Sequence, residues 1–124
     1  MVRYELPTIT LHVEQDDIPV RGNAAASGND TFDREVEDEI LERLENGDVW
    51  AWASVEVRAE LQGLSASAYL GCCNYEDEEA FKKDGYYEDM VREAVDSLAI
   101  ELENLQNIRI SVEDTLHHLK GENK

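Results

Sequence analysis

The sequence predicts an α+β fold, with an antiparallel sheet of about three strands and two main helices packed on one face. Residues 8–13 alternate apolar and polar side chains, and so do residues 49–61 and 64–75, which is the period of half-buried strands. In residues 30–47 and 86–107, apolar residues instead recur every three or four positions. That is the period of helices that cover a core on one side.

The first strand is followed by a long predicted loop. Residues 14–30 hold Pro19, two glycines and several Asn and Asp residues, a composition that favours loop structure. A loop of this length in a compact domain is often functional or mobile. The chain of 124 residues has the size of one domain. We therefore expect a single α+β domain over residues 1–120, which includes the loop, and a frayed tail at residues 121–124.

The first helix is predicted to begin at Asp30 or Thr31, because either side chain can cap a helix N-terminus. Acidic residues crowd its first turn, where the helix dipole favours negative charge. Gly47 is a suitable stop at the other end. One apolar stripe repeats every four residues along this helix: Phe32, Val36, Ile40 and Leu44.

A two-residue turn at Gln62 and Gly63 predicts a hairpin that pairs Leu61 with Leu64. The register continues along both faces of the hairpin. Its pairs are Ala59–Ala66, Val57–Ala68, Val55–Leu70 and Ala53–Cys72 on one face, and Arg58–Ser67, Glu56–Tyr69, Trp52–Cys73 and Trp50–Tyr75 on the other. Two independent alternations agree on this register, so we expect the hairpin to adopt it.

The same register places two tryptophans on the otherwise polar face of the sheet. Two explanations are open. Either the long loop or a subunit partner covers the aromatic end, or the aromatic side chains form an exposed surface that binds a partner. The candidate residues of this aromatic face are Trp50, Trp52, Tyr69 and Tyr75.

The second main helix is predicted over residues 86–107. Its apolar stripe consists of Tyr87, Val91, Ala94, Leu98, Leu102 and Leu105. Residues 108–110 resemble a short strand, and Ser111 with Asp114 resembles a capping pair for a last helical segment. Three apolar residues of that segment are expected to dock on the core: Val112, Leu116 and Leu119.

Charge is the strongest global feature of the sequence. Twenty-nine Asp and Glu against 11 Lys and Arg give a formal net charge of −18. Such a field repels nucleic acids and anionic membranes and favours basic partners, although solubility alone is a simpler explanation of the acidity. No apolar run approaches the ~20 residues of a membrane span, and the first ten residues lack the pattern of a secretory signal. We therefore expect a cytoplasmic protein with no direct nucleic-acid partner and no membrane partner.

The sequence offers little catalytic or metal-binding chemistry. The candidate metal ligands are His12, His117, His118, Cys72 and Cys73, and none of them falls in CxxC, HxxxH or HExxH spacing. A catalytic thiol needs a nearby base or cation, and no histidine has a predicted place beside Cys73. We therefore predict that the chain is not an enzyme and that it has no catalytic residue, no metal ligand and no cofactor.

Acidic residues are concentrated along the two predicted helices. Residues 30–48 hold nine acids and two bases, and residues 76–103 hold eleven acids and three bases. Carboxylates spread along helices can imitate the phosphates of a duplex, and would then bind where another protein has a basic groove for nucleic acid. The candidate residues of this acidic surface are Glu35, Asp38, Glu39, Glu42, Glu45, Glu88, Asp89, Glu93 and Asp96.

Three stretches resemble one group of proteins: "PVRGNAAASGND", "REVEDEILERLENGDVWAWASVEVRAEL" and "YLGCCNYEDEEAFKKDGYYEDM". Together they span roughly residues 18–98 and are similar to widespread small proteins of tailed phages, prophages and plasmids, which are mostly uncharacterised. The resemblance implies an accessory protein of a mobile element and assigns no catalytic residue. Small acidic accessory proteins of phages often act against host defence.

We therefore expect a phage or mobile-element protein that acts in the host cell by stoichiometric binding. The leading hypothesis is an acidic nucleic-acid mimic that inhibits a host defence complex of the restriction or CRISPR type, or a DNA-handling complex. The alternative is an interaction or homodimerising module that uses the aromatic face. An enzyme acting on a small molecule is a third class, and it would need a deep pocket with convergent polar side chains.

Overall fold

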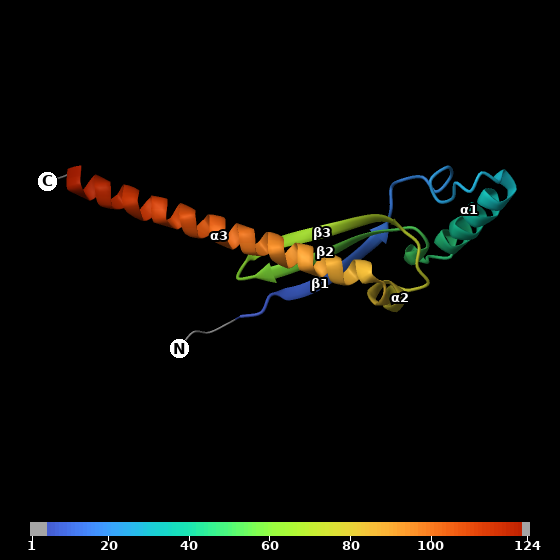
Figure 1. Ribbon diagram of the computed structural model, residues 1–124, viewed down its shortest axis with the longest axis horizontal. Helices are drawn as coiled ribbons and strands as arrows, with labels where there is room; N and C mark the ends of the chain where they lie inside the picture. The colour runs from blue at the N-terminus through green and yellow to red at the C-terminus, as the bar shows by residue number, and fades with distance from the viewer. Residues whose placement is uncertain (1–4, 123–124) are drawn as a thin grey trace.

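The computed structural model describes residues 5–122 and confirms the predicted α+β class. Three strands form one antiparallel sheet in the order β1-β2-β3 (Figure 1). In chain order the elements are β1 (Thr8–Gln15), α1 (Asp30–Glu45), the 3-10 turn η1 (Val49–Ala51), β2 (Ala53–Leu61), β3 (Leu64–Cys73), α2 (Glu78–Lys83) and α3 (Gly85–Glu122).

The β2–β3 hairpin has the predicted register over most of its length. Gln62 and Gly63 form the turn, with φ of 49° and 80°. Two successive positive φ angles are the mark of the type I′ turn, whose twist matches that of the flanking strands. Six predicted pairs are confirmed: Leu61–Leu64, Ala59–Ala66, Arg58–Ser67, Val57–Ala68, Glu56–Tyr69 and Val55–Leu70.

The predicted pairing is wrong at the open end of the hairpin. Ala53 pairs with Cys73 instead of Cys72, because the register shifts between Ala53 and Val55. Cys72 has a φ of 55°, and its backbone N–H donates a hydrogen bond to Asp16 Oδ2 at 2.7 Å. The extra residue is a β-bulge, which bends the strand and reverses the two thiols: Cys73 is buried and Cys72 is exposed.

The two tryptophans lie outside the strand in which they were predicted. Asp48 caps η1 by accepting a hydrogen bond from the Trp50 backbone N–H, so the chain turns there and β2 begins only at Ala53. The predicted Trp52–Cys73 pair is therefore wrong. Trp50 does meet Tyr75, whose backbone N–H donates to the Trp50 carbonyl at 2.9 Å.

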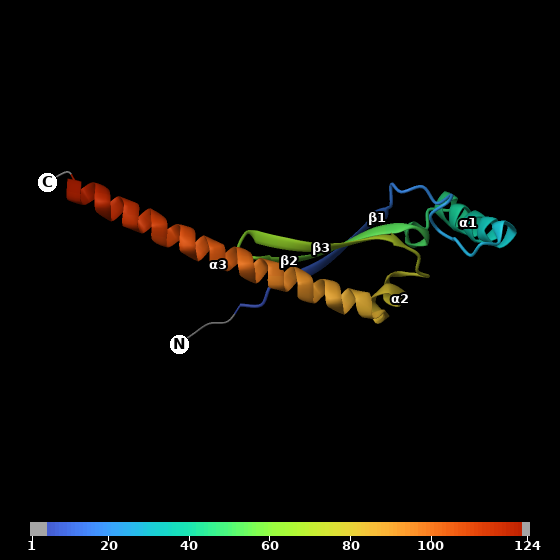
Figure 2. The same ribbon diagram turned by 45° about the horizontal axis from the view of Figure 1, so that its top comes forward.

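Helix α3 covers one face of the sheet over β2 and β3, as Figure 2 shows. Its buried residues Met90, Ala94 and Leu98 face the sheet. Ala59 of β2 is fully buried in the same cluster as Ala94 and Leu98. Small side chains at this contact allow the helix to lie close to the strands. The main core, a neighbouring cluster that includes Val55 and Met90, also forms between α3 and the sheet.

Helix α1 does not pack on that face, which corrects the predicted placement of both main helices there. It lies beyond the end of the sheet where β1 ends and β2 begins, and it packs against η1 (Figure 1). β1 and β2 are neighbouring antiparallel strands, so the segment between them leaves and returns at the same end of the sheet. The apolar stripe of α1 from Val36 to Leu44 packs locally in a second cluster, whereas Phe32 is 52% exposed. The buried members of this cluster are Val20, Ile40, Ala51 and Trp52.

Helix α3 is continuous from Gly85 to Glu122, so the predicted strand at residues 108–110 and the predicted cap at Ser111 are wrong. No proline or glycine interrupts residues 86–120, and nothing else in that stretch stops a helix. Leu116 and Leu119 are 54% and 48% exposed rather than docked on the core. The side chain of Val112 lies outside the described part of the structure.

The predicted frayed tail falls only partly within the described residues. Gly121 and Glu122 are the last two residues of α3, and residues 123–124 lie outside the described range.

Candidate functional site

All nine predicted acidic residues are exposed, but they form two separate groups. Helix α1 stands beyond one end of the sheet, whereas α3 crosses the sheet and continues beyond the other end (Figures 1 and 2). The α1 patch consists of Glu35, Asp38, Glu39, Glu42 and Glu45, and the α3 patch consists of Glu88, Asp89, Glu93 and Asp96. The nine residues therefore lie on two separate helices.

The N-terminus of α1 is held by side chains of the loop before it. Asn29 caps the helix, with its Oδ1 accepting a hydrogen bond from the Phe32 backbone N–H at 3.2 Å. The Ser27 hydroxyl donates to Asp33 Oδ1 at 2.6 Å. The Asn29 bond satisfies a backbone N–H that a helix end leaves unpaired, and the Ser27–Asp33 bond ties the loop to the first turn. Together they fix where the α1 patch begins.

Glu37 joins α1 to the loop and was not singled out from the sequence. It is only 8% exposed and accepts two hydrogen bonds, from Arg21 Nη1 at 3.1 Å and from the Gly22 backbone N–H at 2.7 Å. Arg21 also forms an ion pair with Asp38. Hydrogen bonds from Arg21 to Asp38 and Glu37 raise the pKa of Arg21 above its usual value. The only sequence signal for this contact is that Glu37 borders the apolar stripe.

Arg21 therefore offsets part of the charge of the α1 patch at Asp38. Within residues 5–122, the other four carboxylates of the patch form no ion pair: Glu35, Glu39, Glu42 and Glu45. Their charges are thus exposed to solvent and available to a basic partner.

Arg43, the basic residue in the last turn of α1, faces inward instead of toward the patch. Its Nε donates to Asp48 Oδ2 at 2.8 Å, and its Nη1 donates to Asn74 Oδ1 at 3.0 Å. Its Nη2 donates to the Tyr75 carbonyl at 2.6 Å. The guanidinium fork therefore ties the end of α1 to the chain that leaves β3, and it does not neutralise the outer carboxylates.

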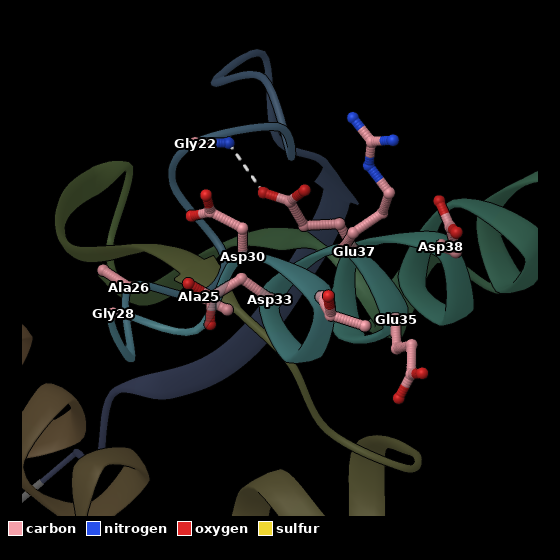
Figure 3. A pocket seen from close by; sticks show the side chains of 11 residues that line it. Gly22, Ala25, Ala26, Gly28, Asp30, Asp33, Glu35, Glu37 and Asp38 are labelled. Carbon is pink, nitrogen blue, oxygen red and sulfur yellow. Dashed lines mark hydrogen bonds between the residues drawn. The ribbon is translucent and has the colours of Figure 1, made fainter.

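An open hollow of about 890 Å³ lies between the loop and the first turns of α1. Figure 3 shows the Gly22 backbone N–H directed at the Glu37 carboxylate, while Glu35 points away from that part of the loop. Asp30 and Asp33 also line the hollow. In the described part of the chain, no three His, Cys, Asp or Glu side chains are arranged to hold a metal ion. The acidic side chains that line the hollow add to the negative charge at this end of the molecule.

The predicted aromatic face does not exist as one surface. Trp50 packs in the main core, with its ring 5.4 Å from Phe81 and 6.4 Å from Tyr75. Trp52 belongs to the second cluster, and its indole N–H donates to the Ile18 carbonyl at 2.7 Å. The long loop therefore covers Trp52, as one of the two explanations required, while Phe81 of α2 covers Trp50.

The other two residues of that predicted face also lie apart. Tyr75 is half-buried, and its hydroxyl donates to Asp84 Oδ2 at 2.7 Å. Burial and this contact with Asp84 raise the pKa of Tyr75. Tyr69 is 71% exposed on the face of the sheet that α3 leaves open. Exposure is thus limited to one of the four aromatic side chains.

A small polar network occupies that open face. The Ser67 hydroxyl donates to Glu56 Oε2 at 2.6 Å, and the Arg58 guanidinium contacts the same carboxylate. The hydrogen bond from Ser67, with smaller contributions from Arg58 and Tyr69, holds the pKa of Glu56 below its usual range. The hollow beside it measures about 180 Å³. Ligand pockets usually exceed about 300 Å³, so this hollow is smaller than a typical ligand site.

The two thiols lie in different environments, since Cys73 is buried and Cys72 is exposed. Burial raises the pKa of Cys73 to about 11, and burial followed by the charge of Asp16 raises the pKa of Cys72. A thiol with a raised pKa is a poor nucleophile at neutral pH. His117 and His118 lie exposed near the end of α3, and His12 lies on β1.

Comparison of the chain with protein-family models, with curated proteins and with solved structures found no match. The resemblance of residues 18–98 to phage and plasmid proteins therefore stays a prediction. Among the helices of the described residues, none has the combination of length and apolar character that crossing a bilayer requires.

Proposed function

We propose that this protein acts by stoichiometric binding, with the α1 patch docked in a basic groove that its target uses for nucleic acid. The observation that supports the proposal is the position of α1. The helix stands clear of the sheet, and four of its outer carboxylates have no ion pair within residues 5–122. A charged helix presented in this way is accessible to a concave partner.

The spacing of the patch is compatible with mimicry of a nucleic-acid strand. From Glu35 to Glu45 the helix rises about 15 Å, at 1.5 Å per residue. Five carboxylates over that length correspond to one charge per roughly 3–4 Å of axis. The phosphates of one DNA strand are spaced about 3.4 Å apart along the duplex axis. A groove that accommodates a strand therefore meets a similar charge density on α1.

The biological role in this proposal is inhibition of a host defence complex, of the restriction or CRISPR type, or of a DNA-handling complex. It rests on the resemblance of residues 18–98 to proteins of phages, prophages and plasmids, and it places the protein in the cytoplasm of the host cell. The aromatic face supplies no second candidate, since Trp50 and Trp52 are buried in different clusters.

Neutralising the α1 patch tests this function. The variant carries Glu35→Gln, Glu39→Gln, Glu42→Gln and Glu45→Gln, and all four side chains are exposed, so the fold is expected to persist. Immobilised wild-type protein should retain a nucleic-acid-binding complex from host lysate, with release at high salt or by added DNA or RNA. We expect the variant to bind that complex at least about tenfold more weakly, because charge complementarity is lost.

The matched control removes the same number of charges from the α3 patch, through Glu88→Gln, Asp89→Asn, Glu93→Gln and Asp96→Asn. It should bind the complex as the wild type does. Equal retention by the α1 variant, or retention that neither salt nor nucleic acid reverses, would contradict the proposal.

A further inference from the structure

The second half of α3 extends beyond the sheet. Among the side chains that the structure describes, Leu98 is the last of the helix to belong to a buried cluster, yet the helix continues to Glu122. Residues 99–106 and 113–119 are all exposed. At 1.5 Å per residue, the projecting part from residue 99 to 122 is about 36 Å long. Figures 1 and 2 both show it extending past the end of the hairpin.

An apolar seam runs along α3 and continues over the projecting half. Its residues are separated by alternating steps of three and four: Val91, Val95, Leu98, Leu102, Leu105, Arg109, Val112, Leu116 and Leu119. This 3.5-residue period is that of a coiled-coil seam, with one arginine among the apolar residues. Leu102, Leu105, Leu116 and Leu119 are exposed. A helix in water draws most of its stability from packing of its apolar face. We therefore expect another segment to pack against the exposed part of the seam.

The seam begins beside an uncovered part of the sheet. Helix α3 packs on β2 and β3, and next to β1 it leaves an apolar groove of about 520 Å³. Ile9 of β1 forms one side of the groove, and Val91 and Val95 of α3 form the other. A second helix lying along the seam would therefore fill this groove and cover the projecting half of α3 at the same time.

The charges of α3 favour its own copy in the opposite direction as that second helix. Residues 85–106 hold six carboxylates and one arginine, whereas residues 107–122 hold three carboxylates, one arginine, one lysine and two histidines. An antiparallel pair sets the acidic half of one copy against the less acidic half of the other. A parallel pair would set the two acidic halves together and would bring position 109, an arginine in both copies, onto itself.

We propose that α3 pairs with α3 of a second copy of this chain in an antiparallel, two-fold coiled coil that fills the groove beside β1. A register centred between Leu102 and Leu105 pairs these two leucines across the axis. It also sets Val91, at the groove, against Leu116 of the second copy. Each contact then occurs twice, as a two-fold interface requires. This pairing is independent of what α1 binds.

The mass of the protein in solution tests the pairing. Light scattering at micromolar concentration should give about twice the 14.1 kDa of one chain. Leu102→Glu with Leu105→Glu places four like charges at the centre of the pair, so the mass should fall to that of one chain. Both leucines are exposed in the single chain, so amide shifts of β2 and β3 should not change.

The control adds the same charges off the seam, through Ile100→Glu and Asn104→Glu, at two exposed positions on the opposite side of α3. It should keep the mass of two chains. A wild type with the mass of one chain, a seam variant that keeps the double mass, or a control that dissociates equally would each overturn the proposal.

A distance between spin labels distinguishes antiparallel from parallel pairing of the two helices. A spin label on His117→Cys, in a chain with Cys72→Asn, reports the distance between the two copies, since buried Cys73 reacts poorly. The antiparallel register separates the two labels by about 40 Å along the axis, at 1.5 Å per residue. A parallel pair would bring them within ~20 Å of each other, because two helix axes lie only 8–10 Å apart, and that result would overturn the antiparallel arrangement.

Discussion

At the scale of single residues, one extra residue in β3 gives two neighbouring cysteines opposite environments. Cys72 takes a positive φ of 55° and lies exposed, held by the hydrogen bond from its backbone N–H to Asp16. Asp16 also accepts a hydrogen bond from the Ile18 backbone N–H at 2.9 Å. One carboxylate therefore fixes both the bulge and the start of the loop, and the next residue, Cys73, enters the core.

This difference predicts which thiol is modified first. Alkylation requires the thiolate, and burial raises the pKa of Cys73 to about 11, so almost none of it is ionised at pH 8. We expect one thiol per folded chain to react at pH 8, and two in denaturant. Mass mapping of the modified peptide should identify Cys72. A Cys72→Asn chain, which suits the positive φ, should lose the reactive thiol. Modification of Cys73 in that folded variant at a comparable rate would contradict the expectation.

At the scale of secondary-structure elements, what could be predicted from the sequence depended on periodicity. The hairpin register followed from two alternating runs and one turn, and it holds from Leu61–Leu64 to Val55–Leu70. The bulge at Cys72 could not be predicted, because nothing in the residue types of the two alternating stretches marks which residue is left unpaired. The stripe of α1 indicated which side of the helix is buried, but not that Val20 and Trp52 would cover it.

For the candidate acidic surface, the sequence likewise predicted the positions within each helix but not the arrangement of the helices. Helical spacing placed all nine acidic residues on exposed faces, and the structure agrees. Spacing within a helix carries no information on where another helix lies, so the separation of α1 from α3 was not predictable. Glu37 was missed because a buried carboxylate depends on a distant cation, here Arg21, which the local pattern does not reveal.

The hairpin turn offers a stability prediction at this scale. Gln62 adopts a φ of 49°, a left-handed conformation that asparagine tolerates better than glutamine. Gln62→Asn should therefore raise the free energy of unfolding by roughly 0.5 kcal/mol, even though the exposed hydrogen bond from Gln62 to Glu5 is lost. Urea denaturation measures the change. Gly63→Ala, at a φ of 80°, should destabilise the protein, and a stabilising effect there would contradict this account of the turn.

At the scale of the whole molecule, negative charge is concentrated on α1 and on the first half of α3, and it exceeds what the local ion pairs balance. The net charge of −18 acts as self-repulsion, whereas the ion pairs of Arg21, Arg43 and Arg58 act over short distances. The excess of acids over bases is large, and these ion pairs are partly exposed and individually weak. Repulsion therefore dominates the response of stability to salt.

Raising the salt concentration should stabilise the protein. Between about 0.01 M and 1 M salt, the screening length falls from about 30 Å to 3 Å, which removes repulsion between distant carboxylates. We expect the midpoint of thermal unfolding to rise by several degrees, on the scale of about 4–8 °C per kcal/mol for a small domain. The chain with four Gln substitutions in the α1 patch should show a smaller rise. A midpoint that falls with salt would mean that the ion pairs dominate instead.

The placement of the two tryptophans in different buried clusters gives the molecule a pair of native optical reporters. Trp50 and Trp52 are separated by one residue in the chain, yet Trp50 lies among the aromatic rings under α2 and Trp52 lies under the loop beside α1. The fluorescence of each indole therefore senses a different half of the protein. Local opening around α1 registers at Trp52 while the sheet core, sensed by Trp50, stays closed.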